Sequence, residues 1–306
     1  MSAVSFPLDL VCAAPNQAAL SEAADFVRQL CSGLKPEKTL AGSRSVRLLD
    51  VPEGLDAARL VTDAARQGLK LDFALVPRSL ALRDFKAAFF DMDSTLVANE
   101  TLDEMARMLG LGEACAEITH KAMTGEIKDY AASLRARVAL LKGLDAGCVK
   151  TLQDDLKLNA GVEPLMARLT AAGLQTYVVS SGFTVLTEVV RRKLNMTGTH
   201  SNVIGIDNGR FTGGVTGPAG GPIIDASGKA AFVRETMQRL GSDPLQTICA
   251  GDGSNDVGMV ESAGFGAGFR PKPVLARVCR MQINFCGFDA LLEAFSDTAE
   301  VFAKSA

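Results

Sequence analysis

The chain has 306 residues, of which 47% are hydrophobic and 22% are charged, and its formal net charge is −3. This length predicts about two domains, and the composition is that of a soluble globular protein. Lys and Arg are scattered along the chain, which excludes a basic nucleic-acid-binding surface, and no apolar run approaches the roughly 20 residues of a membrane span.

The cysteines indicate a reducing compartment. There are 7 of them, without CxxC spacing. An odd number without metal-ligand spacing favours free thiols over a disulfide framework or a zinc site. No basic residue precedes Arg28, which argues against a secretory signal. We therefore expect a cytoplasmic protein.

Residues 1–80 predict a small N-terminal α+β domain. Apolar runs at 8–14, 45–51 and 71–77 are typical of strands, and helical spacing covers 18–32 and 55–67. The alternation resembles the amino-acid-binding ACT domains in pattern, and it fits many other βαβ modules as well. No motif that carries chemistry lies in this segment.

From Lys86 onward the pattern predicts an α/β core over residues 86–306. A buried strand at 86–93 is followed by a helical block at about 100–158, a strand at 174–181, a helix at 183–194 and a hairpin that turns on Asn208-Gly209. A helix at 228–240, a strand at 247–252, a helix at 255–262 and short strands at 264–268 and 282–285 complete it. This order predicts a doubly wound parallel sheet with helices on both faces. The helical block is then an insertion that forms a cap over the sheet's edge.

Polar side chains follow several of these core strands or begin a helix. They are Asp91, Asp93, Ser180, Ser181, Lys229, Asp252, Asn255 and Asp256. The carboxyl ends of neighbouring parallel strands meet at one crevice, where several carboxylates would repel one another unless a divalent cation were bound. Hard oxygen ligands suit Mg²⁺. Lys229, Ser180 and helix-start N–H groups could then bind a phosphoryl group.

Each motif also has a structural interpretation. An isolated DxD is usually a turn or a helix cap, "GDGSND" is often only a loop, and a lone lysine is usually solvated. Their joint occurrence at strand ends and helix starts favours a functional site. His120 and His200 match no such position, and we interpret both as structural.

The motifs together resemble a known family. "DMDSTLVANETLDEMA", "SLRARVALLKGL", "VVSSGFT", "DNGRFTG" and "GDGSNDVGMVESAGFGAGFRPKP" are similar to the phosphoserine phosphatases of the haloacid dehalogenase superfamily. The resemblance covers about 86 to 285, roughly two-thirds of the chain. It implies a Rossmann-like core with a helical cap and a Mg²⁺-dependent phosphatase acting on a small phosphate ester, phosphoserine.

The resemblance also implies the catalytic roles. Asp91 would be the nucleophile that forms an aspartyl phosphate, and Asp93 would be the general acid and base. Mg²⁺ would be bound by Asp91, Asp252 and the backbone carbonyl of Asp93, with Asp256 orienting a metal-bound water. Ser180 and Lys229 would bind the phosphoryl oxygens.

Substrate-binding residues follow by the same resemblance. Glu100 matches the position that binds the ammonium group, Arg137 the one that binds the carboxylate, and Met123 an apolar cap residue. Asn255 and the N–H of Ser181 are expected to contact phosphate or substrate. Arg135 lies two positions from Arg137 and would face another side of the helix.

Three departures bear on specificity. Tyr130 stands where Phe is usual, the segment from Met123 to Ser133 is one residue longer than the common pattern, and Ser181 replaces the usual Gly. They leave open another phosphomonoesterase or phosphotransferase on the same scaffold. A regulator that senses amino acids and has an inert phosphatase half is a further alternative, against which the intact acidic residues argue. A homodimer is compatible with the sequence.

Overall fold

The structure is a computed structural model that describes residues 8–30, 45–48, 51, 57–124, 126–127 and 129–298. Its strands are β1 (Leu8–Ala13), β2 (Ser45–Leu48), β3 (Asp72–Pro77), β4 (Ala87–Phe90), β5 (Gln175–Phe183), β6 (Gly198–Asp207), β7 (Arg210–Thr216), β8 (Thr247–Gly251), β9 (Phe265–Phe269) and β10 (Met281–Ile283). Its α-helices are α1 (Gln17–Leu30), α2 (Ala57–Arg66), α3 (Thr101–Met108), α4 (Gly112–Met123), α5 (Tyr130–Ala139), α6 (Gly147–Asp155), α7 (Val162–Ala171), α8 (Thr184–Lys193), α9 (Ala226–Arg239), α10 (Val257–Glu261) and α11 (Pro273–Ala276).

The described strands form one sheet in the order β2-β1-β3-β10-β9-β8-β4-β5-β6-β7. From β10 to β6 every neighbouring pair is parallel, which confirms the predicted parallel core. Strand β7 is antiparallel to β6, as the Asn208-Gly209 turn predicted. The described helices include none with the length and apolar character that crossing a membrane requires.

Strand β4 lies at the centre of the core and is buried along its whole length. Ala88 and Phe90 pack in the apolar cluster that includes α7, whereas Ala87 and Phe89 pack in the cluster that includes α9 and α10. Successive side chains of a strand point to opposite faces, so helices on both faces require an uninterrupted apolar run. This is why the apolar run before Asp91 predicted a central strand.

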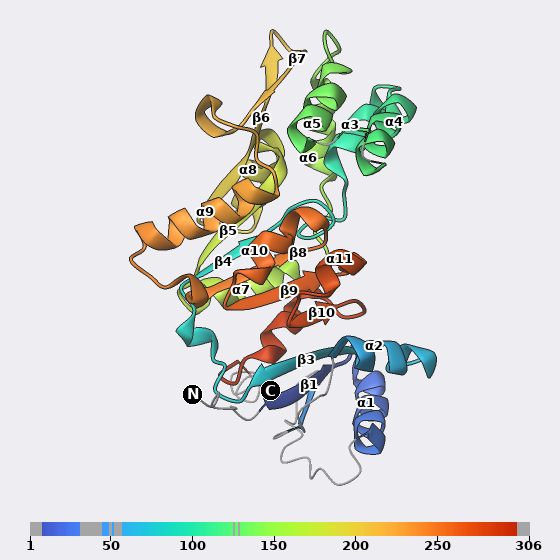
Figure 1. Cartoon of the computed structure of the whole chain (residues 1–306), viewed down its shortest axis with the longest axis vertical. Helices are drawn as coiled ribbons and strands as arrows, with labels where there is room; N and C mark the ends of the chain where they lie inside the picture. Colours follow the sequence, from blue (N-terminus) through green and yellow to red (C-terminus); the bar gives the residue numbers. More distant parts are fainter. Residues whose placement is uncertain are drawn as a thin grey trace.

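Helices α3 to α6 lie between β4 and β5 in the chain and form a separate layer above the carboxyl ends of the strands, beside the β6–β7 hairpin (Figure 1). The cap is tied to that hairpin, since the N–H of Gly143 donates to the carbonyl of Phe211 at 2.8 Å. These four helices run from Thr101 to Asp155, within the segment at about 100–158 where the sequence predicts an insertion.

The N-terminal strands extend the core sheet. Strand β3 is antiparallel to β10, with Ala74 opposite Met281. Asp72 is fully buried and accepts N–H bonds from residues 284, 285 and 286, at 2.7, 3.1 and 2.8 Å. The three strands and two helices expected here are present. Residues 31–32, 49–50 and 55–56, at the ends of the expected elements, lie outside the described residues. Residues 1–80 thus contribute three strands to the common sheet.

Helix α7 was not predicted. Gly161 and Pro164 suggest a break in the pattern, but proline is tolerated in the first turn of a helix because the N–H groups there have no intrahelical partner. Gly161 has φ 82°, and a Cβ there would lie 2.5 Å from the backbone nitrogen of Phe288. Glycine at this position therefore lets α7 begin against the C-terminal segment.

Candidate active site

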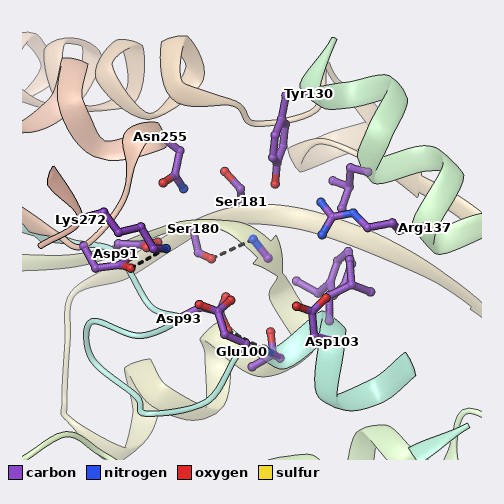
Figure 2. A pocket seen from close by; sticks show the side chains of 16 residues that line it. Asp91, Asp93, Glu100, Asp103, Tyr130, Arg137, Ser180, Ser181, Asn255 and Lys272 are labelled. Carbon is purple, nitrogen blue, oxygen red and sulfur yellow. Dashed lines mark hydrogen bonds and ion pairs between the residues drawn. The ribbon is translucent and has the colours of Figure 1, made fainter. Parts of the chain in front are cut away.

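A cavity of about 140 Å³ lies between the carboxyl ends of the core strands and the cap. Figure 2 shows side chains from both layers pointing into it. The residues that line it are Asp91, Asp93, Glu100, Thr101, Leu102, Asp103, Tyr130, Leu134, Arg137, Ser180, Ser181, Gly182, Phe183, Asp252, Asn255 and Lys272. Most residues predicted to be functional are thereby brought together.

Asp91 and Asp256 share one buried cation. The Nζ of Lys229, a fully buried residue in the first turns of α9, lies 2.6 Å from Oδ1 of Asp91 and 2.8 Å from Oδ1 of Asp256. Burial lowers the pKa of Lys229, but the attraction of Asp256 and Asp91 outweighs it and the pKa is raised. Burial and then the charge of Asp256 raise the pKa of Asp91. Lys229 is therefore a permanent cation that holds Asp91 in place.

Asp256 is fixed from a second side. Its Oδ2 accepts the N–H of Asp252 at 3.2 Å and that of Gly253 at 3.1 Å. A Cβ on Gly251 would lie 2.3 Å from the Asp256 carboxyl group, so glycine is needed at the end of β8 for the carboxylate to pack there. Because three protein groups hold its carboxylate, Asp256 suits a supporting role behind the cavity.

Carboxylate oxygens of Asp91, Asp252 and Asp256 lie within 4.8 Å of one another. All three residues are buried, and Lys272 pairs with Oδ2 of Asp252 at 2.9 Å from the more exposed side. Clustered hard oxygen donors of this kind match the ligand preference of Mg²⁺. The site therefore fits a magnesium ion.

Asp93 lines the cavity from the loop that joins β4 to α3. Its Oδ1 accepts the N–H of Thr101 at 2.9 Å, at the first residue of α3. Burial raises the pKa of Asp93 to about 7, and the bonds from Thr101 oppose that rise. Ser94 has a left-handed φ of 56°, and its hydroxyl donates to Oε1 of Glu100 at 2.7 Å. A carboxyl group that titrates near neutrality can both donate and accept a proton.

The segment 180–182 at the end of β5 packs tightly against these acids. Ser180 is buried, and its Oγ accepts the N–H of Gly182 at 2.8 Å. A Cβ on Gly182 would lie 3.0 Å from both Oδ2 of Asp93 and Oγ of Ser180. The carbonyl of Ser181 accepts a bond from the side chain of Asn202, a fully buried residue, at 2.8 Å. The backbone here is therefore fixed on both sides.

The cap contributes side chains from α5. Asp129 caps this helix by accepting the N–H groups of residues 131 and 132 at 3.1 and 3.2 Å. Tyr130 and Arg137 both reach into the cavity, and Nε of Arg137 is buried without a hydrogen-bond partner among the described residues. Arg135 is exposed, as predicted. The structure does not describe the side chain of Met123. It also does not describe residues 125 and 128, which belong to the segment that is one residue longer than the common pattern.

Among the predicted residues whose side chains are described, Lys229 and Asp256 are outside the cavity lining, since they lie behind Asp91. Neither histidine lines it: His120 is exposed, and His200 stacks on Phe232 with ring centroids 4.1 Å apart. Four polar contributors were missed, namely Thr101, Asp103, Asn202 and Lys272. Lys272 follows β9 at the same sheet edge, which is the one signal that could have identified it.

Comparisons with known proteins agree with this geometry. The family model of the haloacid dehalogenase-like hydrolases matches residues 88–261. A phosphoserine phosphatase from Albidiferax ferrireducens is 42% identical over 217 residues, which cover 71% of this chain and 92% of that protein.

Two solved structures are also similar. A hydrolase of the same family from Salmonella enterica serovar Typhi superposes with a TM-score of 0.82 at 27% identity, covering 95% of this chain and 99% of that one. A phosphoserine phosphatase described as a phospho-aspartyl intermediate analogue gives a TM-score of 0.62 at 31% identity, covering 69% and 99%. The similarity to the Salmonella protein therefore extends over the N-terminal strands as well as the core.

Proposed function

The chain belongs to the haloacid dehalogenase-like hydrolases, and we propose that it is a Mg²⁺-dependent phosphatase that hydrolyses O-phospho-L-serine to L-serine and phosphate. The observation that carries this proposal is the composition of the cavity. At its floor, buried Asp91 is held by Lys229 next to Asp93, and the cap places Arg137 over the same space.

Asp91 is the proposed nucleophile. Lys229 binds Oδ1 of Asp91 at 2.6 Å, which orients the carboxylate so that its other oxygen attacks phosphorus. The bond between phosphorus and the serine oxygen breaks as an aspartyl phosphate forms on Asp91, and Asp93 gives its proton to the leaving serine oxygen. Water then attacks phosphorus while Asp93 takes up a proton, which releases phosphate and restores Asp91.

Asp91, Asp252 and the backbone carbonyl of Asp93 would hold Mg²⁺, and Asp256 would orient a metal-bound water. The clustering of buried carboxylate oxygens within 4.8 Å supports this assignment. When bound, the ion supplies positive charge that balances the charge on the transferring phosphoryl group. Ser180 and the remaining N–H of Lys229 are proposed to bind phosphoryl oxygens.

Substrate recognition is assigned to Arg137 and Glu100, which both line the cavity. Arg137 would bind the carboxylate of phosphoserine, since a guanidinium group can grip a carboxylate through two parallel bonds. Glu100 would bind the ammonium group. Met123 is proposed as an apolar cap residue, and Asn255 and the N–H of Ser181 as contacts to phosphate or substrate; Asn255 and Ser181 line the cavity.

Turnover of a panel of substrates tests the proposal. Phosphate release would be measured with L-phosphoserine, phosphoethanolamine and other small phosphate esters, each with Mg²⁺ and with excess chelator. We expect the highest kcat/KM for phosphoserine and no turnover in chelator. A higher kcat/KM for another ester would support the alternative phosphomonoesterase, and no turnover of any ester would support the regulator.

We also infer a cytoplasmic location, which the free thiols support: the described cysteines, namely Cys12, Cys115, Cys148, Cys249, Cys279 and Cys286, are all unpaired. A homodimer stays a prediction, which light scattering of the purified protein would test.

A further inference from the structure

Two hydroxyl groups from different elements meet in the cavity beside Arg137. Tyr130 is the first residue of α5 in the cap, and Ser181 lies near the end of β5 in the core. In Figure 2 the Tyr130 hydroxyl and the Ser181 side chain lie between Asn255 and Arg137. The two layers therefore place polar groups at a common point.

The Ser181 hydroxyl is a donor without a protein partner. Ser181 is 7% exposed, and its Oγ is buried with no hydrogen-bond partner in the described part of the chain. A buried polar group that is left unpaired costs free energy, so such a group at a binding site indicates a contact that a ligand completes. Nε of Arg137 is buried and unpaired in the same way.

The backbone that carries each hydroxyl is held in position. Asn202 donates to the Ser181 carbonyl and accepts the N–H of Ile224, each at 2.8 Å. The Asp129 cap fixes the helix start that carries Tyr130. These bonds fix the backbone from which the Ser181 and Tyr130 side chains extend.

The charge next to this pair is positive. Burial raises the pKa of Tyr130, whereas Ser181 and then the Arg137 cation act against that rise. Arg137 thus acts on Tyr130 more strongly than does any other charged group, including Lys229 and Asp91. The Ser181 side chain lies near enough to lower the pKa of Tyr130, and its Oγ has no partner at hydrogen-bonding geometry among the described residues. Two neutral donors beside a guanidinium group are suited to an anion.

We propose that the Tyr130 and Ser181 hydroxyls donate hydrogen bonds to the same substrate carboxylate that Arg137 binds. This inference rests on the proposed function and adds two specificity-determining residues to it. A substrate without a carboxylate would leave the buried Ser181 hydroxyl unpaired and the half-buried Tyr130 hydroxyl without this acceptor. Sites built in this way reject the analogue that lacks the partner group. The pair therefore selects phosphoserine over phosphoethanolamine.

The test measures kcat/KM for phosphoserine and for phosphoethanolamine, which keeps the phosphate and the amine but lacks the carboxylate. Tyr130→Phe and Ser181→Ala each remove one hydroxyl, and we expect each to lower the ratio of the two kcat/KM values about 10-fold or more. Tyr177→Phe is the matched control, because its hydroxyl bonds to Gln175 outside the cavity, and it should leave the ratio unchanged. Ser181→Gly removes the Cβ together with the hydroxyl, whereas Ser181→Ala keeps the Cβ. Both variants should lower the ratio to the same extent, since the hydroxyl and not the Cβ is proposed to bind the carboxylate.

The outcomes are distinguishable. Unchanged ratios in folded Tyr130→Phe and Ser181→Ala proteins would overturn the inference, and so would equal losses on both substrates, which would assign the hydroxyls to the phosphoryl group or to cap packing. If the unaltered protein shows no preference for phosphoserine, the proposed function fails instead. Thermal unfolding of each variant would establish that it is folded.

Discussion

Replacing Lys229 by methionine is expected to destabilise the protein by about 3–5 kcal/mol, the usual effect of removing one partner from a buried ion pair. Lys229 is fully buried and bridges Asp91 and Asp256 at 2.6 and 2.8 Å. Methionine has a similar length and no charge, so the variant would leave two carboxylates in an apolar setting with no cation between them. The loss of stability should therefore come from unpaired buried charge and not from an empty cavity.

The assay is thermal unfolding in chelator, followed by the same measurement with Mg²⁺. A loss of that size corresponds to a fall in Tm of roughly 6–20 °C for a domain of this size class. Mg²⁺ should recover part of the loss, because a divalent cation at Asp91 and Asp252 also compensates the acidic cluster.

Lys272→Met is the matched control. Lys272 pairs with Asp252 at a similar distance of 2.9 Å, but its side chain is 62% exposed, and an exposed pair contributes only about 0–1 kcal/mol. Its Tm in chelator should therefore stay near that of the unaltered protein. If Lys229→Met unfolds at the same temperature as Lys272→Met, the account of a buried cation that holds Asp91 is wrong.

Three other predictions follow from the site and the sheet. Asp91→Asn should abolish turnover while the protein stays folded, and Asp93→Asn should slow it by about 10²–10⁴-fold because both proton transfers depend on it; normal rates in either variant would contradict the mechanism. Chelator should silence the enzyme, Mg²⁺ should restore it, and Ca²⁺ should do so poorly because it prefers longer bonds and more ligands; full activity in chelator would refute the metal assignment. Asp72→Ala should lower the free energy of unfolding by about 1–3 kcal/mol or more, since it leaves the N–H groups of residues 284–286 without an acceptor. The control is Asp63→Ala in α2, where Asp63 pairs with the largely exposed Arg66. Denaturant unfolding should show a change of under about 1 kcal/mol for this control.

The core was predictable because its signals are local. An apolar run that ends in Asp91 indicates both a strand buried on two faces and the end of that strand, and the same logic placed Ser180 and Asp252. Helix α7 was missed because Pro164 suggests a break in a short window, although the first turn tolerates proline.

The continuous sheet could not be predicted in the same way. Strands β3 and β10 pair across about 200 residues of chain, and neither strand carries a pattern that specifies its partner. The buried acceptor Asp72 looks like an ordinary polar residue in the sequence, and only its contacts with residues 284–286 show that it joins the two parts.

The sequence predicted which residues gather around the cavity better than how they are oriented there. The spacing did not show that Lys229 is buried between Asp91 and Asp256, outside the residues that line the cavity. Lys272 and Asn202 act through contacts between distant segments, so a single motif does not mark them. Tyr130 and Ser181 were noticed as departures from the family pattern, and their meeting beside Arg137 required the structure.

The central claim is that the cavity selects phosphoserine by its carboxylate, and Arg137→Ala tests it most directly. Losing one partner of a buried charge pair typically costs about 2–5 kcal/mol, so kcat/KM for phosphoserine should fall roughly 30-fold or more. Hydrolysis of p-nitrophenyl phosphate, which has no carboxylate, should change little, and Arg135→Ala on the exposed side of α5 should affect neither substrate. A selective loss on phosphoserine is the predicted result, and an equal loss on both substrates in Arg137→Ala would contradict the claim.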